Sequence, residues 1–98
     1  MLTEQEVMEA MSTTTHPEID CSLLELRMIK DVGIEQERVR VTMNLPFPGI
    51  PIKDHLVQIV KDAIAQKDEA AEVQVAFATM SDAEREDFAR KAREKWKL

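Results

Sequence analysis

The sequence predicts a small α+β fold, with helices mainly on one face of a three-stranded mixed sheet. The clearest signal is the segment 38–45, which alternates polar and apolar residues as a half-buried strand does. The segment 27–34 is mixed in polarity and is expected to pair with it across the polar turn at 35–37. A helical stripe at 52–64 and another alternating segment at 72–80 then complete a strand–helix–strand unit. This order implies a right-handed crossover and a parallel pairing of the last two strands, and the element order becomes α-β-β-α-β-α.

Local signals mark where the first helical segments begin. Thr3 and Glu6 have the spacing of a capping box, and the helix that they open is expected to end at the β-branched run 13–15. Ser22 and Glu25 repeat the same spacing and predict a single helical turn before the first strand.

A further capping box, Ser81 with Glu84, opens a C-terminal helix whose acidic residues come first and whose basic residues come last. That order complements the helix dipole. The apolar stripe of this helix, Phe88, Ala92 and Trp96, is thin. The helix is therefore expected either to extend from the domain and dock on a partner, with Trp96 as an anchor, or to fold back on its own domain.

The chain has 98 residues, which is enough for one domain with its own core. We assign 1–80 to the body of this domain and 81–98 to a C-terminal helical extension of it. Several methionines fall at apolar positions of the expected elements and are interpreted as core residues, namely Met8, Met11, Met28 and Met43.

Charge and cysteine content narrow the classes of function. The formal net charge is −6, and a chain without a basic face is a poor partner for nucleic acid. The single cysteine cannot form an internal disulfide, and the acidic N-terminal segment lacks the apolar core of a signal peptide. No apolar run is long enough to span a membrane. We therefore expect a cytoplasmic protein that binds neither nucleic acid nor membrane.

Residues that could carry chemistry gather in the loop 16–21. A catalytic pair of Cys21 with His16 is conceivable, since a nucleophile needs a base within hydrogen-bond reach. A metal site would use the same two residues with Glu18 and Asp20, although the paired Cys/His spacings of zinc sites are missing. The simpler interpretation, which we favour, is a solvated histidine beside a small buried thiol.

The only Pro/Gly-rich stretch, 46–51, leads into the best-patterned helix, with Pro51 expected in its first turn. A helix N-terminus lowers the pKa of a cysteine placed there and makes it reactive. This chain has Ile50 at that place, after Gly49, and an isoleucine can neither ligate metal nor carry sulfur.

Several short motifs occur in a characteristic order: His-Pro-Glu-Ile at 16–19, Ser-Leu-Leu-Glu-Leu at 22–26, Met-Ile-Lys-Asp-Val at 28–32, Val-Arg-Val-Thr-Met at 39–43 and Pro-Gly-Ile-Pro at 48–51. This order resembles the iron–sulfur cluster assembly domain of the SufT and PaaD type, which also forms the N-terminus of Mrp-type (ApbC) cluster-carrier ATPases. The resemblance covers about residues 5–78 and implies the α+β fold expected above.

Two positions depart from the family pattern. Ile50 stands where the family has the loop cysteine proposed for its chemistry, and Arg27 stands where the family has a glycine. What the resemblance transfers is the loop of His16, Pro17 and Glu18 and the frame of Gly49 and Pro51. We take as the candidate binding surface the two loops together: His16, Pro17, Glu18, Asp20, Cys21, Gly49, Ile50 and Pro51.

Our leading hypothesis is a non-catalytic accessory protein of iron–sulfur cluster assembly or delivery, without a cofactor of its own. It would contact a Mrp-type ATPase or an iron–sulfur client protein. The second hypothesis is a carrier that binds a metal or cluster through Cys21 with His16 or Glu18, which requires a homodimer or an outside ligand. A small-molecule enzyme comes last, because no phosphate loop, nucleophile elbow or metal-helix motif is present.

Overall fold

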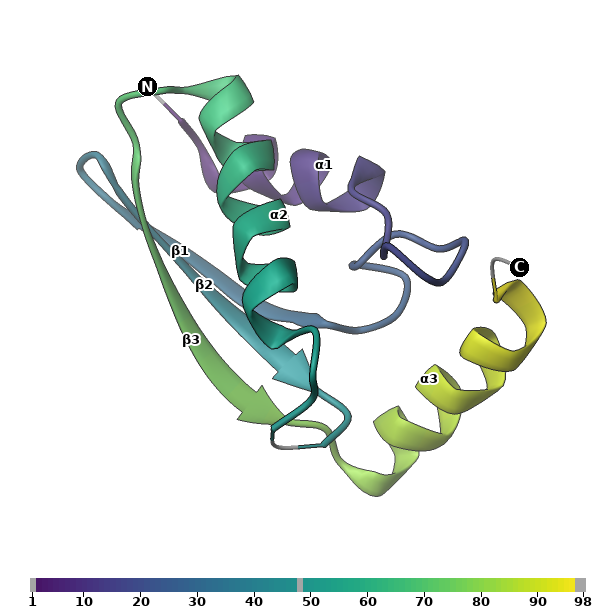
Figure 1. Ribbon diagram of the computed structural model, residues 1–98. Helices are drawn as coiled ribbons and strands as arrows, with labels where there is room; N and C mark the ends of the chain where they lie inside the picture. The colour runs from purple at the N-terminus through teal and green to yellow at the C-terminus, as the bar shows by residue number, and fades with distance from the viewer. Residues whose placement is uncertain (1, 48, 97–98) are drawn as a thin grey trace.

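The computed structural model describes residues 2–47 and 49–96. The elements follow the predicted order: α1 (Glu4–Thr13), β1 (Ile29–Glu35), β2 (Arg38–Leu45), α2 (Lys53–Lys67), β3 (Glu72–Thr79) and α3 (Asp82–Lys95). The helices α1 and α2 lie together over one face of the sheet, and α3 runs past the end of the sheet where β2 and β3 finish (Figure 1). The prediction of an α+β fold is confirmed.

The sheet has the order β1-β2-β3, so β2 is its central strand. β1 pairs antiparallel with β2 across a turn in which Gln36 adopts a positive φ of 58°. β2 and β3 pair in parallel, from Arg38 opposite Glu72 to Leu45 opposite Thr79. The predicted parallel crossover is therefore present, with α2 as the connecting helix.

The core lies between the sheet and the helices α1 and α2. β2 contributes its odd-numbered residues, all of which are buried, and α2 contributes a stripe of Leu56, Val60 and Ile64. The turn 22–28 closes one end of this core with fully buried leucines and Met28. These side chains form one continuous cluster, as expected for a domain of this size.

Two predictions about individual residues are wrong. Met8 was placed in the core but is 36% exposed, because Ala10 and not Met8 shares the buried face of α1 with Val7 and Met11. Pro51 was placed in the first turn of a helix, but α2 begins at Lys53, so the proline lies in the preceding turn. Helix boundaries commonly shift by one or two residues in this way.

The helix α3 folds back along the domain, with Phe88 and Ala92 packed against the core and polar contacts at both of its ends. At its start, Arg85 Nε donates to the carbonyl of Pro46 at 2.8 Å. At its end, the carbonyl of Lys95 accepts from the N–H of Asp20 at 2.7 Å, beside an isolated bridge between Ile19 and Trp96. No residue of α3 that the structure describes is fully buried. No helix within 2–47 and 49–96 combines the length and apolar character that a membrane crossing requires.

The turn before β1 ends in a left-handed residue. Met28 N–H donates to the carbonyl of Leu23, and Arg27 N–H to that of Leu24, both at 3.0 Å. These bonds form a Schellman motif, whose left-handed position is usually occupied by glycine. Here Arg27 occupies it with φ 61°, at the place where the resemblance leads one to expect glycine. The Arg27 side chain forms an ion pair with Asp87 of α3 at 3.2 Å, which offsets part of the cost of this left-handed conformation.

Substitutions at Arg27 should separate backbone strain from the ion pair. We expect Arg27→Gly and Arg27→Asn to stay within about 1 kcal/mol of the native free energy of unfolding, because both tolerate left-handed angles and lose only a partly exposed ion pair, while Asp87 keeps its bonds to Arg90 and Lys91. Arg27→Val should cost more than about 1 kcal/mol, since a β-branched residue fits poorly there. Urea denaturation of the variants measures the difference. Equal stability of the Asn and Val variants would contradict the assignment of strain.

Candidate functional site

The loop 16–21 is a tight turn closed by its own backbone. Its ends are joined by a bridge between Thr15 and Ser22 and by a 3.0 Å bond from His16 N–H to the Cys21 carbonyl. Inside the loop, the N–H of Glu18 donates to Nδ1 of His16 at 2.9 Å. The imidazole, only 4% exposed, is thus a structural part of the loop and not the solvated side chain that we favoured from the sequence.

The loop 46–52 follows β2 and leads into α2. Gly49 adopts φ 74°, a conformation that L side chains rarely take. Ile50 accepts a 3.2 Å backbone bond from Lys53 through its carbonyl, and Ile52 caps α2 without a side-chain hydrogen bond. Pro48, which the sequence placed in this loop, lies outside the described residues.

The two loops and α3 enclose one apolar hollow of about 450 Å³. Its lining comes from the first loop, the second loop, the turn before β1 and one face of α3: His16, Glu18, Ile19, Met28, Pro46, Phe47, Ile50, Pro51, Ile52, Phe88, Ala92 and Trp96. Two aromatic side chains at this hollow remain exposed, Phe47 by 58% and Trp96 by 47%. We refer to it below as the loop hollow.

The structure brings together four of the residues proposed from the sequence, His16, Glu18, Ile50 and Pro51, at the loop hollow. It does not place the other four in the lining. Pro17 and Gly49 lie in the same loops, the backbone of Asp20 is bonded to α3, and Cys21 is buried in the core at 5% exposure. The sequence reasoning missed Phe47 as a site residue, although an isolated aromatic between prolines was a usable signal.

The residues of this region do not fit a metal or an iron–sulfur cluster. A neutral histidine whose Nδ1 accepts a hydrogen bond carries its proton on Nε2, so His16 offers no lone pair to a metal while the loop keeps this geometry. Cys21 is buried, and Ile50 supplies no donor atom. Among the described residues, no three His, Cys, Asp or Glu side chains gather closely enough to hold a metal ion.

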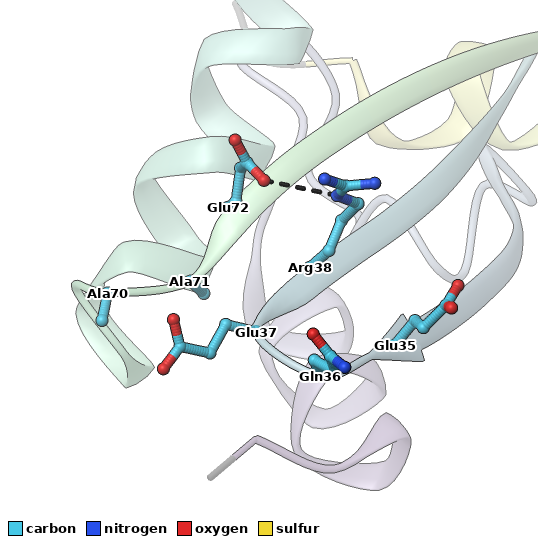
Figure 2. A pocket seen from close by; sticks show the side chains of 7 residues that line it. All are labelled: Glu35, Gln36, Glu37, Arg38, Ala70, Ala71 and Glu72. Atoms are coloured by element: carbon cyan, nitrogen blue, oxygen red, sulfur yellow. Dashed lines mark hydrogen bonds and ion pairs between the residues drawn. The ribbon is translucent and has the colours of Figure 1, made fainter.

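A second hollow lies at the opposite end of β2 and has a different character. It measures about 670 Å³ and is lined by polar and small residues around the turn between β1 and β2. Figure 2 shows Arg38 reaching across to Glu72, with which it pairs at 3.3 Å, while Glu35 and Glu37 point to opposite sides of the turn. These carboxylates do not converge on a common point, so we assign no site there.

Comparison with known proteins places the chain in a family. A model of the family described as iron–sulfur cluster assembly protein matches residues 4–77. The chain belongs to this family.

Two relatives in this group are named iron–sulfur cluster carrier proteins. The chain is 34% identical over 64 residues to that of Synechocystis sp. and 30% identical over 74 residues to that of Deinococcus radiodurans. The matches cover 65% and 76% of this chain but 18% and 21% of the relatives, so the chain spans about a fifth of their length.

Solved structures support the fold of this family member. A domain of unknown function from Bacillus anthracis superposes with a TM-score of 0.72 at 20% identity, covering 93% of this chain and 88% of that one. A conserved hypothetical protein from Thermotoga maritima gives the same score and identity and covers 95% of this chain and 92% of that one. The likeness extends over nearly the whole chain and therefore beyond the residues that the family model matches.

The carboxylates of Glu84 and Asp87 stabilise the position of α3, which lines one side of the loop hollow. The pKa of Glu84 is lowered, first by the backbone N–H of Ser81 and then by the amide of Asn44, which donates at 3.0 Å. The pKa of Asp87 is lowered, first by its hydrogen bond from Arg90 and then by that from Lys91. Both groups therefore stabilise the folded arrangement above their ordinary pKa, and this contribution is lost as the pH falls through the lowered values.

Acid should loosen α3 before it unfolds the core. As the pH falls past the ordinary carboxylate range and through the lowered pKa values of Glu84 and Asp87, α3 should detach from β2 and from the turn 22–28. The single tryptophan, Trp96, reports on this, because its fluorescence emission should shift to longer wavelength while the circular dichroism of the sheet persists. The variant Glu84→Gln with Asp87→Asn should show the shifted emission already at pH 7. An emission spectrum that changes only together with global unfolding would contradict this.

Proposed function

We propose that this member of the iron–sulfur cluster assembly family is an accessory protein of cluster assembly or delivery, acting through protein–protein contact and not through catalysis. The proposal rests chiefly on the loop hollow, an apolar surface built at the two loops that carry the family resemblance. The names of the Synechocystis and Deinococcus relatives, iron–sulfur cluster carrier proteins, support the biological setting.

The chemistry of the loop hollow favours a protein partner. Most of its lining is apolar, and its exposed aromatic side chains, Phe47 and Trp96, belong to the residue types that anchor protein interfaces. Arg85 lies over the Phe47 ring with its guanidinium carbon 5.4 Å from the centroid, which restricts the orientation of the ring. A partner that inserts an apolar side chain would bury these rings. A Mrp-type ATPase or an iron–sulfur client protein is the partner that we propose.

The alternative, a carrier that ligates a cluster itself, has less support. It needs thiolate or imidazole donors, and the loop geometry withholds both Cys21 and His16. In our proposal the cluster is cargo held by the partner. An enzyme acting on a small molecule remains the least favoured possibility, because no nucleophile with an adjacent base is found at the loop hollow.

Anaerobic reconstitution with iron and sulfide separates the accessory protein from the carrier. We expect the native chain and Cys21→Ala to bind equally little iron and to show no cluster absorption, because the thiol is buried. Iron content and the absorption spectrum of both proteins measure this. A cluster that forms on the native chain and disappears in Cys21→Ala would favour the carrier instead.

Binding to a purified Mrp-type ATPase tests the surface. Phe47→Ala removes an exposed ring at the loop hollow and should weaken binding at least about tenfold by calorimetry, as expected for an interface anchor. Met8→Ala is the matched control, since it also truncates an exposed apolar side chain, but one that lies on α1 and not at the loop hollow. If both variants bound the ATPase as tightly as the native chain does, the loop hollow would not be the binding surface. The ATPase would be the wrong partner if the native chain did not bind it.

A further inference from the structure

The outer edge of the sheet at β3 is open. β3 is hydrogen-bonded to β2 on one side, and no other described segment pairs with it. In Figure 1 no element runs along its outer side. None of its residues is fully buried, whereas the neighbouring β2 buries its entire odd-numbered face. The edge is thus available to a further strand.

The backbone of β3 presents a regular row of bonding groups at this edge. Glu72 N–H donates to the carbonyl of Glu37 at 2.9 Å, and Met80 N–H to that of Leu45 at 2.8 Å. Because N–H and C=O groups alternate sides along a strand, the even-numbered residues of β3 bond to β2. The odd-numbered residues therefore direct their backbone groups outward: Val73, Val75, Phe77 and Thr79.

The two edges of the sheet differ in how they are protected. β1 carries charged Lys30 and Asp31, a glycine and an irregular register between Ile29 and Asp31, features that discourage pairing at an edge. In β3, residues 73–79 contain no charge, proline or glycine and are rich in residues that favour strands. An edge without such protection is a template for pairing with another strand.

We propose that β3 pairs antiparallel with β3 of a second copy of this chain, which joins the two sheets into one. A two-fold axis at Ala76 uses all of the outward backbone groups. It places Val75 opposite Phe77 of the partner subunit and Val73 opposite Thr79 of the partner subunit, with about eight hydrogen bonds in all. Glu72 then lies opposite Met80 of the partner subunit, so no like charges meet. This self-complementarity selects a second copy as the occupant.

The dimer should be reversible and sensitive to salt. A contact between single edge strands is small compared with a standard protein interface. Each chain also carries a net charge of −6, so the two subunits repel one another at low ionic strength. Association should therefore depend on protein concentration and strengthen as salt is added.

The dimer is independent of the function proposed for the loop hollow. The loop hollow lies where β2 ends, and an antiparallel pair places the two hollows at opposite ends of the joined sheet. The separation is at least about one strand length, roughly 25 Å. The two subunits thus keep separate binding surfaces and do not combine their Cys21 residues in one cluster site.

Charge substitutions at the two-fold axis test the proposal. Ala76 is exposed in the single chain, so neither Ala76→Lys nor Ala76→Glu should disturb folding. Each would face its own charge across the axis and should raise the dimer dissociation constant at least about tenfold, while an equimolar mixture of the two should dimerise again. Sedimentation equilibrium at high salt, across a range of protein concentrations, measures the mass change from one chain toward two.

Two further proteins complete this test. Val75→Pro removes an outward N–H without removing a bond to β2, so it should also yield monomers with an intact fold by circular dichroism. Met8→Lys adds the same charge as Ala76→Lys on α1 and should leave the dimer intact. A native chain that stays monomeric at millimolar concentration would overturn the proposal, as would a dimer unaffected by the Ala76 and Val75 substitutions.

Discussion

The burial of one face of β2 is the constraint on which the remaining structure depends. Val39, Val41, Met43 and Leu45 are all at most 3% exposed, and a shift of one residue would bring the arginines and Thr42 into the core. This fixes the register of β1 on one side and of β3 on the other. It also fixes the ends of β2, so that the loop 46–52 emerges beside the turn 22–28. The position of the loop hollow is a consequence of this register.

Much of the fold follows from local patterns in the sequence. The period of two in β2 and the helical stripe of α2 are strong signals because the odd-numbered residues of β2 and the residues Leu56, Val60 and Ile64 of α2 are all buried. The capping boxes at Thr3 and Ser81 are confirmed, since they need only residues three positions apart. Met8 was misplaced because it lies at the border of the buried face of α1, where packing against α2 selects small Ala10 over a larger side chain.

The arrangement of α3 and of the loop hollow could be predicted only in part. Both loops were singled out from their residues and joined into one candidate surface through the family resemblance, and the structure brings residues of both together. The docking of α3 combines the partly buried Phe88 and Ala92, which pack against the core, with single polar bonds between distant segments, such as Lys91 Nζ to the carbonyl of Glu25 at 2.7 Å. Such bonds produce no periodic pattern in the amino-acid sequence, so they cannot be predicted from it. Asn44, one of the polar residues of the alternating segment 38–45, is likewise buried through such a long-range bond, since its amide donates to Glu84.

The replacement of the expected loop cysteine by Ile50, together with the burial of Cys21, leaves the loop hollow without an exposed thiol. A cysteine at a helix N-terminus is readily oxidised to sulfenic acid or to a mixed disulfide. A surface built from isoleucine, proline and aromatic rings is not subject to that thiol chemistry. A partner bound through this surface, as proposed above, would therefore not be lost through oxidation of a thiol at the contact.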